Sequence, residues 1–454
     1  MPRSLSESGS GSRSRFLPGP DWPFPVRYSP IFYGWLILPI STLGILASMP
    51  GQTMGIAVFT EPLMAALGLS RTQLSIAYLI GTVGSALFLT RAGRLYDRVG
   101  ARALLVLSSL ALGAALVYFA MLEWLLMPFD GALRSATAFA LVCVGYLGIR
   151  FAGQGVLTSA SRNVLLAWFE RRRGLVNGVR GVFVSLGFSL APPLLAALIL
   201  LFGWQGALLV LALVCGLGFA LLALLLVRDA PEPCGLRPDG DLPPADDQPW
   251  PGIRGASLEQ VRRSPVFWLY TLSLSMHSLF ATAITFHVVS VFTEAGRTSA
   301  EAFGYFLPMA LVATSVNMLA SWASDRTTLR PWLLLMLTAF ITAVVGMLTL
   351  ETDAGYWLLV LGQGVGGGLW AMISNITFVR LFGRASLGAI SGLNASLTVF
   401  GSAVGPALFS VGLDLFGSFR AAAWFCGVGF AMILAVALVL RRLPEEGTPV
   451  PAQR

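Results

Sequence analysis

Twelve long apolar segments, separated by short charged or Gly- and Pro-containing breaks, dominate the sequence. Each has at least 20 residues, the length that an α-helix needs to cross the roughly 30 Å hydrocarbon core of a bilayer. Only 11% of the 454 residues are charged and 56% are hydrophobic, whereas a soluble domain carries about 25% charged residues. The sequence therefore predicts an all-α integral membrane protein with twelve transmembrane helices, at residues 33–60, 72–92, 102–126, 136–162, 174–200, 204–227, 265–292, 300–323, 330–350, 356–380, 388–414 and 420–440.

The longest polar interruption divides the twelve segments into six and six, and it is rich in proline and in charged residues, as is typical of a linker. The first 30 residues are rich in Ser, Arg and Pro and lack an apolar core, so they do not resemble a signal peptide. We expect a disordered cytoplasmic tail, an N-terminal six-helix bundle, a cytoplasmic linker, a C-terminal six-helix bundle and a second cytoplasmic tail, at residues 1–30, 31–228, 229–263, 264–441 and 442–454.

All 30 basic residues are arginines, and their distribution indicates the orientation of the chain. When loops are assigned alternately to the two sides, 25 arginines fall on the side of both termini and four on the other side, while Arg150 lies inside a span. Cytoplasmic loops of membrane proteins carry the excess of positive charge. We therefore expect both termini in the cytoplasm, in a bacterial inner membrane or a plasma membrane, and no nucleic-acid partner for the formal charge of +8.

Several chemistries are excluded by residues that the chain lacks. Without lysine it has neither the phosphate-binding lysine of a Walker A loop nor an amine for a Schiff base. The four cysteines form no CxxC pair, and His277 and His287 face about 80° apart on one helix. We expect no metal site, no cofactor and no enzymatic activity.

The two halves of the chain repeat at an offset of 214 residues. This offset aligns Gly174 with Gly388, Gly178 with Gly392, Gly187 with Gly401, and Pro192 with Pro406. Internal repeats built of membrane helices are typical of secondary transporters, whose substrate site lies between the repeats near the bilayer midplane.

The loop after the second span carries the most specific motif in the chain. Residues 93–102 read Gly-Arg-Leu-Tyr-Asp-Arg-Val-Gly-Ala-Arg and resemble the Gly-x-Leu-x-Asp-Arg-x-Gly-Arg/Lys signature of the major facilitator superfamily. The eighth span ends in a degenerate copy of this motif. With the twelve spans and the repeat, this resemblance implies two pseudo-symmetric six-helix bundles.

The chemistry of this motif predicts a conformational latch. Gly93 would let two helices approach closely, and Asp97 can accept hydrogen bonds from arginines or from the N–H groups at the start of a neighbouring helix. Such a contact must break when the two halves move. We expect Gly93, Asp97 and Arg98, together with Asp325 and Arg326 of the copy, to form the latch.

Glycine and proline recur in the fifth and eleventh spans. The fifth span resembles a Gly-Pro pattern associated with proton-driven antiporters of the superfamily, with Ala191 at one glycine position, and the eleventh carries the fuller version. Because the pattern occurs in both halves, we expect it to serve helix packing and bending. The residues concerned are Gly178, Gly187, Pro192, Gly392, Gly401, Gly405 and Pro406.

Arg150 is the strongest candidate for a functional site. A guanidinium near mid-membrane is costly and usually faces a cavity or pairs with another group, and residues 150–155 resemble the superfamily's fourth-helix Arg-x-x-Gln-Gly motif with one residue inserted. No interior carboxylate is available, so one interpretation is an anionic substrate held by two parallel N–H···O bonds. The other is a structural lock in which Gln52, Gln154 and backbone carbonyls hold Arg150.

Other polar side chains at interior depth are weaker candidates for the transport path. A histidine could carry a proton near physiological pH, although a buried neutral histidine is the alternative. Single amides also hold membrane helices together. The candidates beside Arg150 are Gln52, Gln154, His287, Asn317, Gln363 and Asn375.

Short matches along the chain resemble the monocarboxylate-porter and oxalate/formate-exchanger branch of the superfamily. They lie at residues 32–35, 70–72, 168–174 and 306–309. Members of this branch carry small carboxylates, often with a proton or by exchange. The eighth-helix arginines of characterised relatives would fall near Asn317, and the eleventh span lacks the lysine of oxalate exchangers, which argues against oxalate/formate exchange.

These observations predict a secondary active transporter, a symporter or an antiporter, that carries a small organic anion of the monocarboxylate type by alternating access. Two alternatives stay open: a proton-coupled efflux carrier for hydrophobic compounds, which usually needs a membrane carboxylate, and a non-transporting sensor on the same fold. The expected partners are the lipid bilayer, the anionic substrate and, as one candidate coupling ion, the proton. We expect the protein to function as a monomer.

Overall fold

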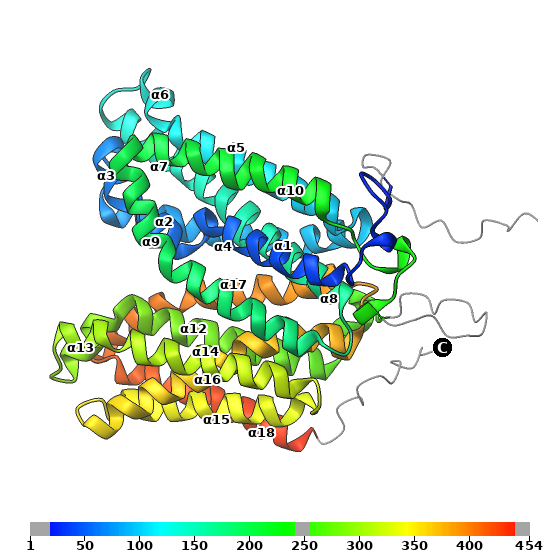
Figure 1. Ribbon diagram of the computed structural model, residues 1–454. Helices are drawn as coiled ribbons and strands as arrows, with labels where there is room; N and C mark the ends of the chain where they lie inside the picture. Colours follow the sequence, from blue (N-terminus) through cyan, green and yellow to red (C-terminus); the bar gives the residue numbers. More distant parts are fainter. Residues whose placement is uncertain (1–18, 241–254, 441–454) are drawn as a thin grey trace, which may run out of the picture.

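The computed structural model describes residues 19–240 and 255–440. These residues are almost entirely helical and contain no strand beyond an isolated bridge between Gly255 and Gly383. The helices form two groups, one from each half of the chain, which are drawn in blue to green and in yellow-green to red in Figure 1. The expected tail at 442–454 and the first part of the tail at 1–30 lie outside the described residues.

The first group of helices contains two π-helical turns, η3 and η4, inserted in longer helices. Its elements are η1 (Val26–Tyr28), α1 (Gly34–Ala47), η2 (Met49–Gly51), α2 (Thr53–Ala57), α3 (Thr60–Leu67), α4 (Arg71–Val99), α5 (Ala101–Ala120), α6 (Leu122–Leu126), α7 (Gly131–Ile149), η3 (Arg150–Leu157), α8 (Thr158–Trp168), α9 (Arg173–Leu211), η4 (Ala212–Gly218) and α10 (Phe219–Leu226).

The second group follows two short 3-10 turns of the linker, η5 (Glu232–Cys234) and η6 (Pro238–Gly240). Its elements are α11 (Leu258–Arg262), α12 (Pro265–Glu294), α13 (Ser299–Gly304), α14 (Phe306–Ser324), α15 (Leu329–Leu348), α16 (Asp353–Phe382), α17 (Leu387–Phe416) and α18 (Arg420–Val439).

Eleven helical stretches of the described chain are long and apolar enough to cross a membrane. One of them, Arg173–Leu226, has 54 residues and would be about 80 Å long if straight, more than twice the thickness of the hydrocarbon core. It turns back at Gly203, whose φ of 69° and ψ of 170° are accessible essentially only to glycine. The corner, which lies within α9, is visible in Figure 1. This stretch therefore crosses twice, and the twelve expected spans are present.

Each group of helices has its own apolar core. One cluster of buried side chains runs from Val26 to Cys234, and the other runs from Ala256 to Ala437 with Leu166 added. The outer faces also carry large apolar side chains, such as Leu200, which is 87% exposed. Such exposure is expected where hydrocarbon replaces water as the solvent. The two groups are thus two separately packed bundles.

Local sequence sets the start of several helices. Ser70, Ser257 and Thr298 each form a capping box. The hydroxyl accepts the backbone N–H of the third helical residue, and the side chain of that residue accepts the backbone N–H of the capping residue. Each cap satisfies N–H groups that have no partner inside the helix and contributes about 1 kcal/mol to helix stability.

Residues 19–28 pack against the end of the first bundle, although the sequence assigns them to a disordered tail. Two buried arginines hold them: Arg102 donates to the carbonyl of Trp22 at 3.0 Å, and Arg228 donates to the carbonyl of Pro20 at 2.8 Å. A buried guanidinium needs acceptors for its N–H groups, and the segment supplies them. Packed structure is therefore present in the chain before the first span.

The described parts of the linker also pack against the bundles. Asp229 accepts a backbone N–H at the start of α5 at 2.8 Å. Asp239 accepts three N–H groups in the loop before α9, at 2.9, 2.8 and 3.3 Å, and Glu232 forms an ion pair with Arg384 of the second half. The linker thus joins the two bundles at one end of the molecule.

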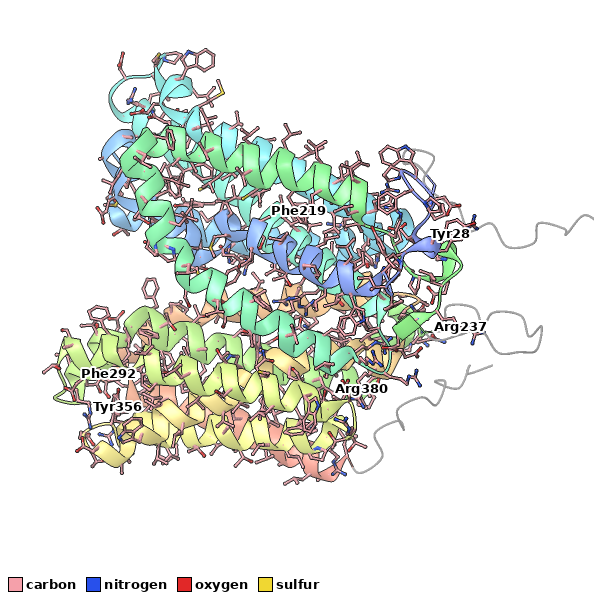
Figure 2. All side chains as sticks on the ribbon, viewed as in Figure 1. Tyr28, Phe219, Arg237, Phe292, Tyr356 and Arg380 are labelled. Atoms are coloured by element: carbon pink, nitrogen blue, oxygen red, sulfur yellow. The ribbon has the colours of Figure 1, made fainter. Side chains whose placement is uncertain are left out.

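We call this end, where residues 19–28 and the linker lie, the linker end. Figure 2 places Tyr28, Arg237 and Arg380 at the linker end, and Phe292 and Tyr356 at the opposite end. The ribbons of the two bundles lie close together near the linker end and diverge toward the opposite end (Figure 1).

Candidate functional site

The two bundles contact each other mainly through two pairs of helices, α4 with α17 and α9 with α14. At the linker end of the first pair, the carboxylate of Asp97 accepts the backbone N–H of Gly388 at 2.8 Å and that of Ala389 at 2.9 Å. These N–H groups belong to the first turn of α17 and have no partner inside it. The positive end of the helix dipole also favours a carboxylate there.

The second pair of helices is joined in the same way. Asp325, which follows α14, accepts the N–H of Gly174 at 2.6 Å and that of Leu175 at 2.9 Å at the start of α9. Burial raises the pKa of Asp325 above its ordinary value, while the two N–H donors act in the opposite direction. Gly174 and Gly388 are aligned by the 214-residue repeat, so the motif and its copy make equivalent contacts.

The other latch candidates differ in what they contact. A Cβ atom on Gly93 or on Gly388 would come closer than 3.0 Å to the carbonyl oxygen of the other residue, so these glycines lie face to face. Arg98 and Arg326 are exposed, and the guanidinium of Arg326 lies 4.7 Å from the ring of Trp322 in its own bundle. Among the latch candidates, the contact between bundles is therefore made by carboxylates, N–H groups and glycines.

Arg150 lies inside the first bundle and is 2% exposed. Its Nε donates to Oγ1 of Thr82 at 3.1 Å, and its Nη1 donates to the carbonyl of Gly51 at 3.0 Å. The ring of Tyr78 lies 5.0 Å from the guanidinium carbon. Groups of the same bundle occupy these donors, an arrangement that favours the structural lock over the anion clamp.

The two glutamines expected beside Arg150 have other surroundings. Nε2 of Gln52 donates to Oγ of Ser48 at 3.0 Å and to Oγ1 of Thr158 at 3.1 Å. The side chain of Gln154, in η3, makes no hydrogen bond with a described residue. The lock around Arg150 is therefore built from a backbone carbonyl, hydroxyl groups and an aromatic ring.

A second buried arginine, Arg180, occupies the interface between the bundles. It lies in α9, almost two turns beyond Gly174, and is 2% exposed. Its Nη2 donates to Oδ1 of Asn177 at 2.7 Å and to Oδ1 of Asn375 at 3.0 Å, and its Nη1 donates to Oγ of Ser41 at 3.4 Å. Because Asn375 belongs to α16, Arg180 joins the first bundle to the second.

The polar network around Arg180 extends into α14. Nδ2 of Asn177 donates to Oγ of Ser321 at 3.1 Å, and that hydroxyl donates to Oδ1 of Asn317 at 3.2 Å. Asn317 and Asn375, both candidates from the sequence, therefore belong to one network that crosses the interface. All side-chain partners of Arg180 in this network are neutral.

Arg162 of α8 adds a second positive charge to this region. It lies close enough to Arg180 for the two charges to repel each other. Arg162 is partly exposed and makes no hydrogen bond or ion pair with a described residue. Neither arginine has a carboxylate partner within the described chain, so no neighbouring acid compensates either charge. We call Arg162 and Arg180 the arginine pair.

Neither member of the arginine pair is among the site residues expected from the sequence, because both are assigned there to the loops on the side of the termini. Arg162 is the last residue of the predicted span 136–162, and Arg180 lies six residues inside the predicted span 174–200. That depth was a usable signal for Arg180, since an arginine within an apolar span needs an explanation.

The remaining candidates lie within the second bundle. His287 interrupts α12, and its Nε2 lies 3.0 Å from the carbonyl oxygen of Pro406 in α17. Gln363 of α16 is 4% exposed. Neither side chain is hydrogen-bonded to the network around Arg180. The described residues also contain no group of three or more side chains suited to hold a metal ion.

The glycines and prolines of the fifth and eleventh spans lie at helix contacts. Gly178 and Gly392 face the other bundle, at α14 and α4, Gly187 faces α1, and Gly401 and Gly405 face α12, while Pro192 and Pro406 lie inside α9 and α17. Close backbone approach at small residues is a common way to pack membrane helices. These contacts support a packing role in both halves.

Two curated relatives have names that refer to organic acids. The chain is 28% identical over 141 residues to the "Probable L-galactonate transporter" of Escherichia coli, which covers 31% of this chain and 28% of that protein. It is 28% identical over 286 residues to "Monocarboxylate transporter 13" of Bos taurus, which covers 62% of each chain. Both alignments span less than two thirds of the relative's own length.

Comparisons with structures and with family profiles establish the fold. A crystal structure of a bacterial homologue of the iron transporter ferroportin, in an outward-facing state, matches 89% of this chain and 98% of that chain, with a TM-score of 0.67 and 16% identity. The profile of the Major Facilitator Superfamily matches residues 40–398. The chain, with its two helical bundles and this match over most of its length, therefore belongs to the Major Facilitator Superfamily.

Proposed function

We propose that this membrane transporter is a secondary active carrier of a small organic anion, and that the anion binds between the bundles at the arginine pair. The observation that carries the proposal is the burial of Arg180 between the bundles, where its side-chain partners Ser41, Asn177 and Asn375 are all neutral. Two like charges close together in a region of low dielectric constant repel each other strongly. A bound anion would remove that repulsion, so the site favours a carboxylate over a neutral or cationic solute.

The geometry of Arg180 suits a carboxylate. A planar guanidinium binds carboxylates through two parallel N–H···O bonds. The amide oxygens of Asn177 and Asn375 orient the guanidinium at 2.7 and 3.0 Å without neutralising it. A carboxylate oxygen of the substrate would replace a neutral amide oxygen as the acceptor from Arg180. The new hydrogen bond is stronger because its acceptor is charged.

The named relatives agree with a carboxylate substrate. The L-galactonate transporter and the monocarboxylate transporter named above are similar to parts of this chain. Both names refer to solutes that carry a carboxylate. We propose Arg150 as the structural lock of the first bundle, since groups of that bundle accept hydrogen bonds from its Nε and Nη1.

Binding at this site would be linked to alternating access. We place the linker end in the cytoplasm on the excess of arginine there, so the structure represents a state closed to the cytoplasm. Opening this end breaks the contacts of Asp97 and Asp325, and it also separates Arg180 from Asn375 of the other bundle. Substrate that replaces Asn375 as a partner of Arg180 would therefore favour opening.

The proposal is tested by transport in proteoliposomes. We expect wild-type protein to take up radiolabelled monocarboxylates or sugar acids by counterflow, and the Arg180→Gln and Arg162→Gln variants to lose most of this uptake while their melting curves show folded protein. Arg172→Gln is the matched control, because it removes an exposed arginine beside α9 and should transport normally.

A binding screen of the purified protein separates this function from the alternatives. A ligand that binds only the folded state raises the melting temperature. Stabilisation by one class of carboxylate, absent in Arg180→Gln, would support the proposal. Stabilisation by hydrophobic cations alone, or equal carboxylate binding by wild type and Arg180→Gln, would refute it.

A further inference from the structure

A groove of about 760 Å³ lies on the first bundle, away from the contact with the second bundle. Its α4 wall includes Phe88, Arg91 and Leu95, which share one helix face because they are spaced by three and four residues. Gly93 and Asp97, which contact α17, lie on the opposite face of α4. The groove is therefore separate from the substrate site and opens toward the surrounding lipid.

Small side chains on three elements create the groove. α4 and α5 form its walls, and α7 and η3 form its floor. Ala111 on the α5 wall and Gly148 and Ala152 on the floor leave space. The lining runs from Leu104 to Ala111 on α5, which corresponds to about 10 Å along the helix axis. One leaflet of the hydrocarbon core is about 15 Å deep. The groove is thus long enough to hold part of one acyl chain.

Three arginines line the α4 wall of the groove, with Arg98 nearest to the linker end and Arg91 deepest. Arg91, Arg94 and Arg98 are exposed, and none of them makes an ion pair or hydrogen bond with a described residue. The guanidinium of Arg91 lies 5.6 Å from the ring of Phe88. In contrast, the nearby Arg102 is buried and uses its donors on backbone carbonyls. The charges of the three groove arginines are therefore free to bind an anion.

We propose that this groove binds one anionic phospholipid, with its phosphate at Arg94 and Arg98 and an acyl chain along the floor of α7 and η3. Arginines near the membrane surface attract anionic headgroups. Arg91 lies about 10 Å deeper than Arg98 along α4, and its long side chain extends toward the interface beside the glycerol backbone. A free anion leaves the apolar groove empty, and a neutral lipid leaves the arginines without a partner, so an anionic amphiphile matches both features.

The test measures lipid binding to the purified full-length protein by native mass spectrometry, with dioleoyl phosphatidylglycerol and dioleoyl phosphatidylcholine as probes. We expect wild type to prefer phosphatidylglycerol. The Arg91→Gln, Arg94→Gln, Arg98→Gln triple variant should bind phosphatidylglycerol about 100-fold more weakly, because each basic residue near an anionic headgroup contributes roughly fivefold.

Two further variants distinguish lipid binding in the groove from attraction of an anionic lipid to any group of exposed arginines. Ala111→Trp should weaken phosphatidylglycerol binding at least about tenfold by filling the groove, since Ala111 is exposed and its replacement leaves the core intact. The matched control removes three exposed arginines from the linker end of the second bundle, at Arg262, Arg263 and Arg326, and should change binding less than about twofold.

Three results would overturn the proposal, provided that melting curves show all variants to be folded. They are equal binding of the two lipids by wild type, equal losses in the groove variant and the control variant, and displacement of phosphatidylglycerol by inorganic phosphate with no effect of Ala111→Trp. The last result would assign the arginines to a free-anion site. None of these readouts depends on the substrate proposed for the transporter.

Discussion

Replacement of Gly388 by alanine should weaken the closed contact at the linker end. An added methyl group would lie 2.8 Å from Oδ1 of Asp97, 2.8 Å from the ring of Tyr96 and closer still to the carbonyl oxygen of Gly93. Ordinary contacts of this kind are 3.4 Å or longer. α4 and α17 must therefore separate by more than about half an ångström, which also lengthens the hydrogen bonds to Asp97.

The cost of this separation sets the expected effect. Overpacking a tight contact costs about 1–3 kcal/mol, and a methyl group against backbone atoms belongs near the upper end because the backbone cannot move aside as a side chain can. A loss of about 2–3 kcal/mol lowers the ratio of closed to open molecules about 30- to 150-fold. Alanine is otherwise preferred over glycine in helices, so destabilisation of the closed state must come from the contact.

The opening can be measured by electron–electron double resonance between spin labels at Glu170 and Arg326, exposed positions in the two bundles. Cys143 is replaced by serine in this background, because the other three native cysteines are buried. Gly388→Ala should add a population with longer distances. Gly367→Ala is the matched control, since no atom lies within 4 Å of its added methyl. Superimposable distance distributions for the two variants would refute the reasoning.

Three further changes test other parts of the structure by thermal melting. Gly203→Ala should destabilise the protein by about 1–3 kcal/mol, because the backbone there adopts a conformation that essentially only glycine tolerates; a shift no larger than that of Gly367→Ala would contradict this. Burial raises the pKa of Asp229 above its ordinary value of 3.8. The folded chain therefore retains a proton that the unfolded chain has released, and stability should fall as the pH rises from about 4 through the raised pKa. Asp229→Asn should remove this dependence of stability on pH, whereas Asp414→Asn, at an exposed site, should not. Arg150→Lys should lower the melting temperature by removing the bonds to Gly51 and Thr82, while the KM of the folded fraction for the anion stays unchanged; a selective rise in KM would assign Arg150 to the substrate instead.

The sequence by itself determined the fold class and the number of crossings. In a bilayer core a chain must satisfy its backbone hydrogen bonds internally, so an apolar segment of 20 residues is a helix whatever its neighbours are. The contacts of Asp97 and Gly93 were also predictable, because a carboxylate in the last turn of a membrane helix and a small residue one turn earlier have few other uses. Their equivalence with Asp325 followed from the repeat, which aligns Gly174 with Gly388.

Only the tertiary structure decided which arginine lies between the bundles. Sequence shows how deep a residue lies in a span, but it does not show which helix faces the residue. Thr82 and Gly51, which hold Arg150, are 68 and 99 residues away from it in the chain, and Asn375 is 195 residues from Arg180. The roles of the two arginines therefore depend on contacts that form only when distant helices pack together.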